Sequence, residues 1–216
     1  MITVKTINYS IGTKTILESI SLNVQNGEFL CILGPNGAGK STFIKVICGL
    51  IKAGSGDVFI KDHPVQSYPK KELAKIIAYV PQMSPLEMRF TVEDYVMTGR
   101  YPYQSRLGGI SAEDKRVVDE VINRTGLNDL RERDISTLSG GERQRAVIAA
   151  ALAQETEVLL LDEPTIYLDP KSAADVLNLL AKIHKSGVTI VMVTHDINQS
   201  LIYGTAFAGL KRGKLI

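Results

Sequence analysis

Short apolar runs separated by polar and glycine-rich stretches divide the chain into strands and helices. Alternating apolar and polar positions predict strands over 2–9 and 16–24, and the Asn26-Gly27 turn precedes a third, apolar strand. The remaining predicted strands cover 29–33, 57–61, 77–80, 158–161 and 188–193, and the predicted helices of this part cover 41–50, 69–76 and 170–185. Continuous apolar strands separated by helices indicate a parallel sheet covered on both faces. The pattern therefore predicts an α/β fold.

The middle of the chain is different, because the pattern from about residue 84 to 153 is helical. Helices are predicted over 92–98, 112–125 and 141–154. We interpret 84–153 as a helical subdomain inserted into one domain, 1–216, whose core is formed by 1–83 and 154–216.

Composition narrows the class of protein. The chain has 216 residues, of which 44% are hydrophobic and 22% charged, as in an ordinary globular protein. Its apolar runs are far shorter than the roughly 20 residues that cross a bilayer, and its start lacks a secretory signal, so we expect it in the cytoplasm. A formal net charge of +2 gives no support for nucleic-acid binding. Cys31 and Cys48 lie in apolar patterns, and we expect buried, unreactive thiols.

A glycine-rich loop follows the third strand. Gly34 to Ser41 reads Gly-Pro-Asn-Gly-Ala-Gly-Lys-Ser, which matches the phosphate-binding motif G-x-x-x-x-G-K-[ST] between a strand and a helix. Its backbone N–H groups and the helix N-terminus would face phosphate. We expect Lys40 to hold the β- and γ-phosphates, Ser41 to reach Mg²⁺, and Thr42 to lie near the α-phosphate. The predicted nucleotide-binding residues here are Asn36, Gly37, Ala38, Gly39, Lys40, Ser41 and Thr42.

Two carboxylates follow the apolar strand 158–161. Asp162 and Glu163 would lie at the carboxyl edge of the sheet, where ligands of open α/β folds bind. Asp162 is predicted to hold the metal through water, and Glu163 to polarise the water that attacks phosphate. Solvation of a strand end is the alternative interpretation.

A second helix N-terminus carries the same type of chemistry. Ser139, Gly140 and Gly141 open the helix that ends near residue 154. One nucleotide cannot easily occupy both helix starts, so we predict that two copies of the chain clamp ATP between them. An ordinary serine N-cap is the alternative, although it needs neither the paired glycines nor the basic Arg143 and Arg145.

Leu138 to Gly141 resembles the signature of ABC ATPases, and the resemblance covers nearly the whole chain. It implies a P-loop NTPase core with a mostly parallel sheet, an N-terminal antiparallel β-subdomain and an inserted helical subdomain. Gln82 resembles the Q-loop glutamine that senses Mg²⁺ and contacts the membrane partner. His195 resembles the switch histidine that contacts the γ-phosphate, and Leu168-Asp169 resembles the D-loop that crosses the dimer interface.

The match with that family is imperfect at several positions. Glu142 replaces the usual glutamine, and Ile166-Tyr167 replaces small, polar residues. Ile11 aligns with the aromatic residue that stacks on adenine, so plain apolar contact is expected there unless Tyr9 compensates.

The string Gly-Arg-Tyr-Pro-Tyr at 99–103 resembles ATPases of siderophore, haem and cobalamin importers. This implies ATP and Mg²⁺ as cofactors and a peripheral place on the cytoplasmic face of the membrane. The implied partners are a second copy, two permease subunits and, indirectly, a substrate-binding protein. Tyr101 and Tyr103 would then be docking residues, although an exposed turn is the alternative. An ATPase of a molybdate or tungstate importer, and a soluble ABC ATPase of the cluster-assembly type, remain the alternative functions.

Overall fold

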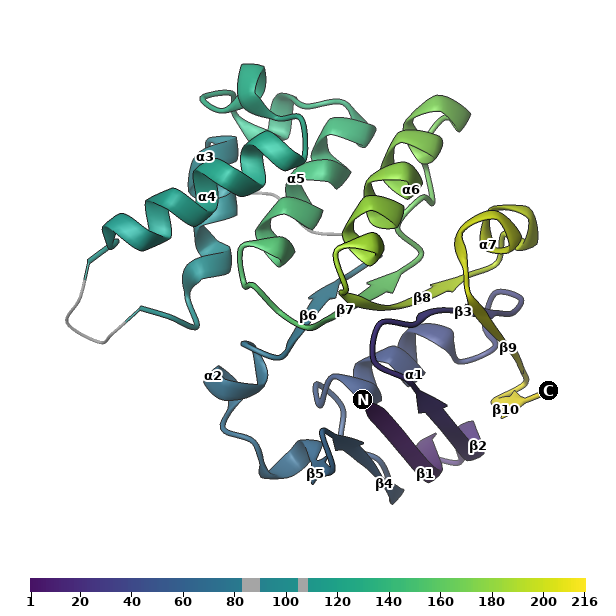
Figure 1. Cartoon of the computed structure of the whole chain (residues 1–216). Coiled ribbons are helices and arrows are strands. Elements are labelled where there is room, and N and C mark those ends of the chain that lie inside the picture. The colour runs from purple at the N-terminus through teal and green to yellow at the C-terminus, as the bar shows by residue number, and fades with distance from the viewer. Residues whose placement is uncertain (83–89, 105–108) are drawn as a thin grey trace.

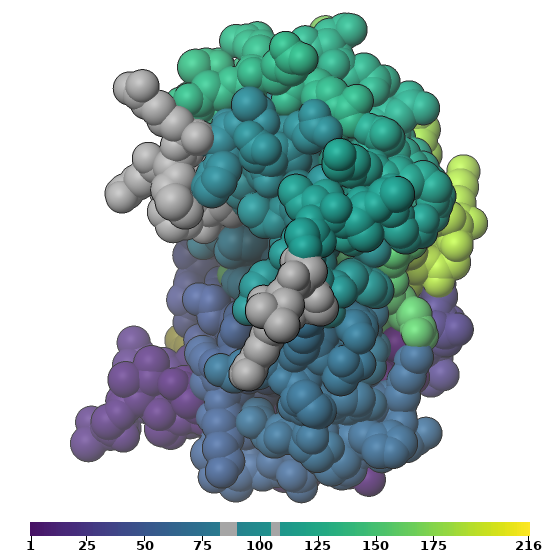
Figure 2. Space-filling view, turned by 90° about the vertical axis from the view of Figure 1, so that its left-hand side faces the viewer, coloured from purple at the N-terminus to yellow at the C-terminus, as the bar shows by residue number. Residues whose placement is uncertain are grey.

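The computed structural model describes residues 1–82, 90–104 and 109–216 (Figure 1). The chain begins with a four-stranded antiparallel sheet, in which the first two strands form a long hairpin and β4 pairs with the other side of β1. The strand order is β2 (Lys14–Val24), β1 (Ile2–Ile11), β4 (Ser55–Ile60) and β5 (His63–Pro64). In Figure 2 this hairpin, in purple, projects from the body of the molecule.

A second sheet of six strands forms the centre of the molecule. Its strands run parallel to one another except for the last, β10, which pairs antiparallel with β9. The order is β10 (Lys214–Leu215), β9 (Ala206–Lys211), β3 (Phe29–Leu33), β8 (Thr189–Thr194), β7 (Val158–Asp162) and β6 (Ile77–Val80). The parallel strands carry almost no polar side chains because helices or the other sheet cover both faces.

Each face of the central sheet has its own core. On one face, α1 (Lys40–Ile47) packs between the central and antiparallel sheets, and its Phe43 and Ile44 are fully buried there. On the other face lie α5 (Gly140–Leu152), α6 (Pro170–Lys185) and α7 (Ile197–Tyr203) (Figure 1). The carboxyl ends of β3, β7 and β8 therefore meet the start of α1 at one edge of the sheet.

A third core lies within the helical part. It joins α3 (Val92–Met97), α4 (Ala112–Arg124) and α5. Helix α5 belongs to two cores, because Val147 and Ile148 face the central sheet while Ala146 and Ala149 face α3 and α4. Short 3-10 turns occur at Val65–Ser67, Thr98–Arg100, Asn128–Leu130 and Ile135–Thr137. The predicted boundary of the helical subdomain at residue 84 lies outside the described residues.

The predicted fold class is confirmed, and the helix ends differ from the prediction for local reasons. Helix α1 ends at Ile47 rather than residue 50, because Gly49 has φ +71° and adopts the left-handed conformation that terminates helices. The helix expected over 69–76 is a single turn, α2 (Lys70–Leu73), closed by the i−3 hydrogen bond from Ile76 N to Leu73 O.

The structure shows the environment of both thiols. Cys31 and Cys48 are buried, and burial raises the pKa of each thiol to about 11, so both are unreactive near neutral pH. Across the described ranges, no helix combines the length and the apolar composition that a bilayer crossing requires.

Candidate functional site

The glycine-rich loop between β3 and α1 is held against its own chain on two sides. A Cβ atom on Gly34 would lie 2.2 Å from the Leu210 carbonyl oxygen, and one on Gly39 would lie 2.9 Å from that of Ile16. Gly37 and Gly39 also have φ values of +77° and +103°, which side chains disfavour. The glycines thus let the loop pass close to β9 and β2 and deliver the N–H groups of α1 to the cavity.

Lys40 is buried and already has partners from its own chain. Its ammonium donates to Gly34 O at 2.8 Å and to Pro35 O at 3.2 Å, and it lies 3.0 Å from Glu163 Oε1. The other Glu163 oxygen, Oε2, lies 2.7 Å from His195 Nδ1. The structure thus brings together Lys40, Glu163 and His195, which the sequence places on three different elements.

Glu163 occupies an unusual backbone position at the end of β7. Its φ is +47°, and its N–H donates to Val193 O at 2.9 Å. A non-glycine residue in this region is uncommon and costs free energy, so the surrounding structure must hold it. The strained turn directs the buried carboxylate toward Lys40 and His195.

The neighbouring carboxylate, Asp162, faces the start of α1. Its Oδ1 accepts from Ser41 Oγ at 2.9 Å and its Oδ2 from Tyr79 OH at 3.3 Å. Burial raises the pKa of the Asp162 carboxyl, although these two hydrogen bonds oppose the rise. A carboxylate beside a hydroxyl is an oxygen donor set that fits Mg²⁺, which binds few protein ligands together with substrate phosphates. The described residues contain no group of three His, Cys, Asp or Glu that could hold a metal ion.

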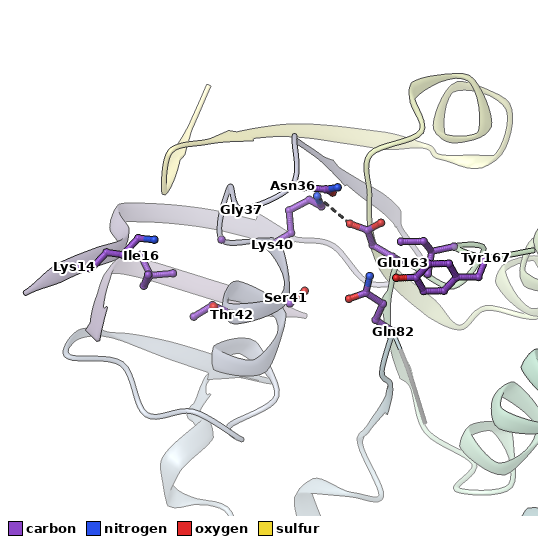
Figure 3. A pocket seen from close by; sticks show the side chains of 12 residues that line it. Lys14, Ile16, Asn36, Gly37, Lys40, Ser41, Thr42, Gln82, Glu163 and Tyr167 are labelled. Carbon is purple, nitrogen blue, oxygen red and sulfur yellow. Dashed lines mark ion pairs between the residues drawn. The ribbon is translucent and has the colours of Figure 1, made fainter. Parts of the chain in front are cut away.

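Of these residues, Lys40, Ser41 and Glu163 line a cavity of about 410 Å³ (Figure 3). Gln82, Glu163 and Tyr167 lie at one end, and Lys14 and Ile16 of β2 lie at the other, with the loop and Ser41 between them. The full lining is Lys14, Ile16, Asn36, Gly37, Gly39, Lys40, Ser41, Thr42, Gln82, Glu163, Ile166 and Tyr167. Most of the predicted phosphate-loop residues are thus brought to one cavity together with Gln82.

The predicted adenine contact is not among the residues that line this cavity. Ile11 is 60% exposed, and Tyr9 packs against the core of the antiparallel sheet. The register shift between Tyr9 and Ser10 leaves the extra residue, Ile16, on the partner strand β2. The sequence reasoning did not select Lys14 and Ile16, and spacing alone does not give them a common face, because Ile16 is the extra residue of this register shift.

The second helix start, at α5, is organised differently. Ser139 is exposed and caps α5: its hydroxyl accepts from Glu142 N at 3.4 Å, while Glu142 Oε2 accepts from Ser139 N at 2.8 Å and from Ser139 Oγ at 2.7 Å. These hydrogen bonds lower the pKa of the Glu142 carboxyl. Arg143 donates to Ser136 O at 2.9 Å, so this arginine braces the preceding turn.

The paired glycines also have a local role that the sequence did not reveal. A Cβ atom on Gly141 would lie 2.7 Å from Ser172 Oγ at the start of α6, whereas one on Gly140 would lie 3.3 Å from a Leu168 methyl group. Ser172 itself donates to Asp169, which caps α6. Close packing of α5 on α6 therefore accounts for Gly141. Gly140 remains exposed and borders a second cavity, of about 170 Å³, together with Gln82 and Tyr167.

The segment that connects β7 to α6 lies between the two helix starts. Thr165 Oγ1 donates to Gln199 of α7 at 3.0 Å, which ties the segment to the switch region after β8. Tyr167 has φ +66° and is 78% exposed, and both Ile166 and Tyr167 line the cavities next to Glu163 and next to Gly140. The two residues that depart from the family pattern thus stand at the junction of both sites.

Residues 99–103 form a braced turn. Arg100 is buried, and it contacts Asp114 Oδ1 at 2.9 Å, Glu155 Oε2 at 2.6 Å and Ala153 O at 2.7 Å. Tyr103 stacks with its ring centre 4.0 Å from the Arg100 guanidinium and donates its hydroxyl to Gln154 O at 2.9 Å. Tyr103 therefore has a structural role of its own, whereas Tyr101 is 72% exposed. Docking of a partner on these tyrosines stays a prediction.

Comparison with known proteins gives consistent matches. The family model described as ABC transporter matches residues 17–166. The iron(3+)-hydroxamate import ATP-binding protein FhuC of Bacillus subtilis (strain 168) is 38% identical over 95% of this chain and 77% of its own length. The ferric enterobactin transport ATP-binding protein FepC of Escherichia coli (strain K12) is 37% identical over 95% of this chain and 76% of its own length. The dimeric ATP-binding cassette MJ0796 bound to ADP and Pi superimposes with a TM-score of 0.85 at 32% identity, covering 100% of this chain and 96% of that one.

Proposed function

The chain belongs to the ABC transporter ATP-binding family, and on this premise we propose that it hydrolyses ATP to drive uptake of a metal chelate through a separate permease. The observation that carries the ATPase part is that Glu163 contacts both Lys40 and His195 and lines the phosphate-loop cavity together with Lys40. The chelate part is supported by relatives named for the import of ferric hydroxamate and ferric enterobactin. A molybdate or tungstate importer and a soluble cluster-assembly ATPase have no such support.

In the proposed mechanism, the phosphates enter the cavity and replace Glu163 as the partner of Lys40. Lys40 then neutralises the charge that develops on the transferred phosphoryl group, and α1 supplies backbone N–H donors. Glu163, freed from Lys40, accepts a hydrogen bond from the attacking water and orients it toward the γ-phosphorus. His195, which contacts Glu163 at 2.7 Å, keeps that carboxylate in place and can reach the γ-phosphate.

Mg²⁺ would be held by Ser41 and Asp162, with Gln82 at the open side of the cavity. It would neutralise negative charge on the phosphates of the nucleotide. Ser41 and Asp162 already lie within hydrogen-bond distance of each other, so this part of the site needs little rearrangement.

The start of α5 completes the proposal. Ser139 and Gly140 are exposed and do not line the cavity around Lys40. We place them against the nucleotide of a second copy, so that two chains close over two ATP molecules. Two permease subunits and, through them, a substrate-binding protein would be the remaining partners, with the ATPase on the cytoplasmic face of the membrane.

The hydrolysis step is tested with Glu163→Gln, which retains the shape of the side chain but removes the carboxylate. Phosphate release by the ATPase assembled with its permease should fall about 100-fold, because general-base assistance contributes at least that much. Nucleotide binding should remain. The exposed Glu132→Gln is the matched control and should hydrolyse normally. Equal rates for Glu163→Gln and the wild type would refute the assigned role.

The transport step needs a separate measurement. Cells that lack this subunit should lose uptake of a radiolabelled ferric hydroxamate and regain it with the wild-type chain but not with Glu163→Gln. Uptake of radiolabelled molybdate serves as the control and should not change. Loss of molybdate uptake with normal iron uptake would favour the alternative importer.

A further inference from the structure

A tyrosine of β6 contacts the carboxylate that we propose to hold Mg²⁺, and the proposed hydrolysis mechanism does not use it. Tyr79 OH donates to Asp162 Oδ2 at 3.3 Å, and this hydroxyl has no other hydrogen bond within the described part of the chain. Tyr79 is half-buried and Asp162 is only 2% exposed, so water has little access with which to replace the hydroxyl. The contact therefore belongs to the environment of the proposed metal.

The sheet register explains how Tyr79 reaches this carboxylate. Tyr79 pairs with Leu160 in the parallel ladder of β6 and β7, and both side chains pack into the core on the face that α1 covers. Asp162 lies two residues after Leu160 on β7 and therefore points to the same face. The hydroxyl at the end of the Tyr79 ring thus meets Asp162 from the side of β6, at the carboxyl end of the strands.

The two oxygens of Asp162 face different elements. Oδ1 accepts from Ser41 Oγ of α1 at 2.9 Å, whereas Oδ2 accepts from Tyr79 on β6. Ser41 is the other residue that we propose to hold the metal, so a cation beside Ser41 would meet the Oδ1 side of the carboxylate. To bring both oxygens onto that cation, the carboxyl group would have to turn, and Oδ2 would have to leave Tyr79.

Magnesium and calcium ions differ in how they use a carboxylate. Mg²⁺ is small and demands near-ideal octahedral geometry, whereas Ca²⁺ accepts more oxygen ligands at longer distances and often takes both oxygens of one carboxylate. We propose that Tyr79 is a positioning residue that holds Oδ2, restricts Asp162 to one oxygen for the metal, and so favours Mg²⁺ over Ca²⁺. This inference rests on the proposed function, since it concerns the metal of the same site.

The test compares both metals on Tyr79→Phe, which removes the hydroxyl and keeps the ring. The purified chain is saturated with a non-hydrolysable ATP analogue and with Mn²⁺, and Mg²⁺ or Ca²⁺ is added while electron paramagnetic resonance measures the Mn²⁺ released. In Tyr79→Phe the dissociation constant for Ca²⁺ should fall about threefold and that for Mg²⁺ should stay the same, because Ca²⁺ no longer breaks a hydrogen bond.

The matched control removes a tyrosine hydroxyl from a different part of the fold. Tyr68 is also half-buried, and its hydroxyl donates to Ile60 O of β4 at 2.9 Å. Tyr68→Phe should leave the dissociation constants of both metals unchanged. A general effect of losing a hydrogen bond would appear in both variants, whereas the proposed effect is confined to Tyr79→Phe.

The outcomes separate this inference from the proposed function. An unchanged dissociation constant for Ca²⁺ in Tyr79→Phe would overturn the inference and leave the ATPase intact. Weaker binding of Mg²⁺, alone or together with Ca²⁺, would also overturn it, because the hydroxyl would then support binding of any metal rather than select one. Failure of the wild type to bind the ATP analogue with either metal would contradict the proposed function itself.

Discussion

The two helix N-termini that we propose to bind phosphate, at α1 and α5, differ in how much of their environment comes from the same chain. At α1, Lys40 is only 4% exposed and has partners at Gly34, Pro35 and Glu163. At α5, Ser139 and Gly140 are exposed, and the cap consists only of Glu142 from the first turn of the same helix. Contacts from other elements enclose the start of α1. The start of α5 is capped by a residue of its own helix and is exposed.

Under the proposed function, this difference indicates which of the two helix starts one chain can complete alone. A buried ammonium must be paired, and Glu163 pairs that of Lys40 in this structure. An exposed helix start needs no such pairing, because water satisfies its N–H groups. Changes at α1 should therefore alter nucleotide binding by the single chain, whereas changes at α5 should alter packing and association first.

The largest effect is expected for Lys40→Met, which keeps the packing of the alkyl chain but removes the charge. ATP affinity should fall about 100-fold, because charge-assisted hydrogen bonds to two phosphates are lost. The measurement is calorimetric titration of the purified chain with ATP. Ser139→Ala is the contrasting variant, and it should bind ATP like the wild type in the same experiment.

The loss of Lys40 also leaves Glu163 with His195 alone, which could weaken folding and imitate a loss of binding. The double variant Lys40→Met/Glu163→Gln removes this problem, since no unpaired buried carboxylate remains. It should unfold close to the wild-type temperature and still fail to bind ATP. ATP binding by the double variant would contradict the role of Lys40.

A smaller effect is expected from the paired glycines, which form a matched comparison on one helix. Gly141→Ala should destabilise the chain by about 1–3 kcal/mol, because its methyl group would overlap Ser172. Gly140→Ala meets only the flexible end of Leu168 and should stay within about 1 kcal/mol of the wild type. The measurement is urea unfolding. Equal destabilisation by both changes would show that Gly141 is not needed for packing α5 on α6.

The sequence predicted more of the environment of α1 than of α5, because the spacing of residues in a short motif identifies the phosphate loop and the two carboxylates. Asp162 and Glu163 follow an apolar strand, and the sheet edge then brings them to α1 without further information. The contact of Glu163 with Lys40, the place of Lys14 and Ile16, and the packing of Gly141 on α6 all depend on tertiary distances. Tyr103 illustrates the same limit, since its stacking on Arg100 joins residues whose partners lie on α4 and in the segment after α5.

The smallest effect concerns the cap of α5 and depends on pH. Hydrogen bonds with Ser139 lower the pKa of Glu142 from its usual 4.5. The ionised carboxylate therefore stabilises the folded chain fully above about pH 4.5, and this stabilisation is lost as the pH falls through the lowered pKa. Glu142→Gln should therefore cost about 0.5 kcal/mol at pH 7, where it removes a negative charge from a helix N-terminus, and less in acid. Urea unfolding at pH 7 and at a pH below 4.5 measures the change, with the exposed Glu132→Gln as the control. If the loss in free energy of unfolding does not shrink in acid, Glu142 acts at this helix start through its shape, as the glutamine usual for the family would. Its charge would then add nothing at the exposed start of α5.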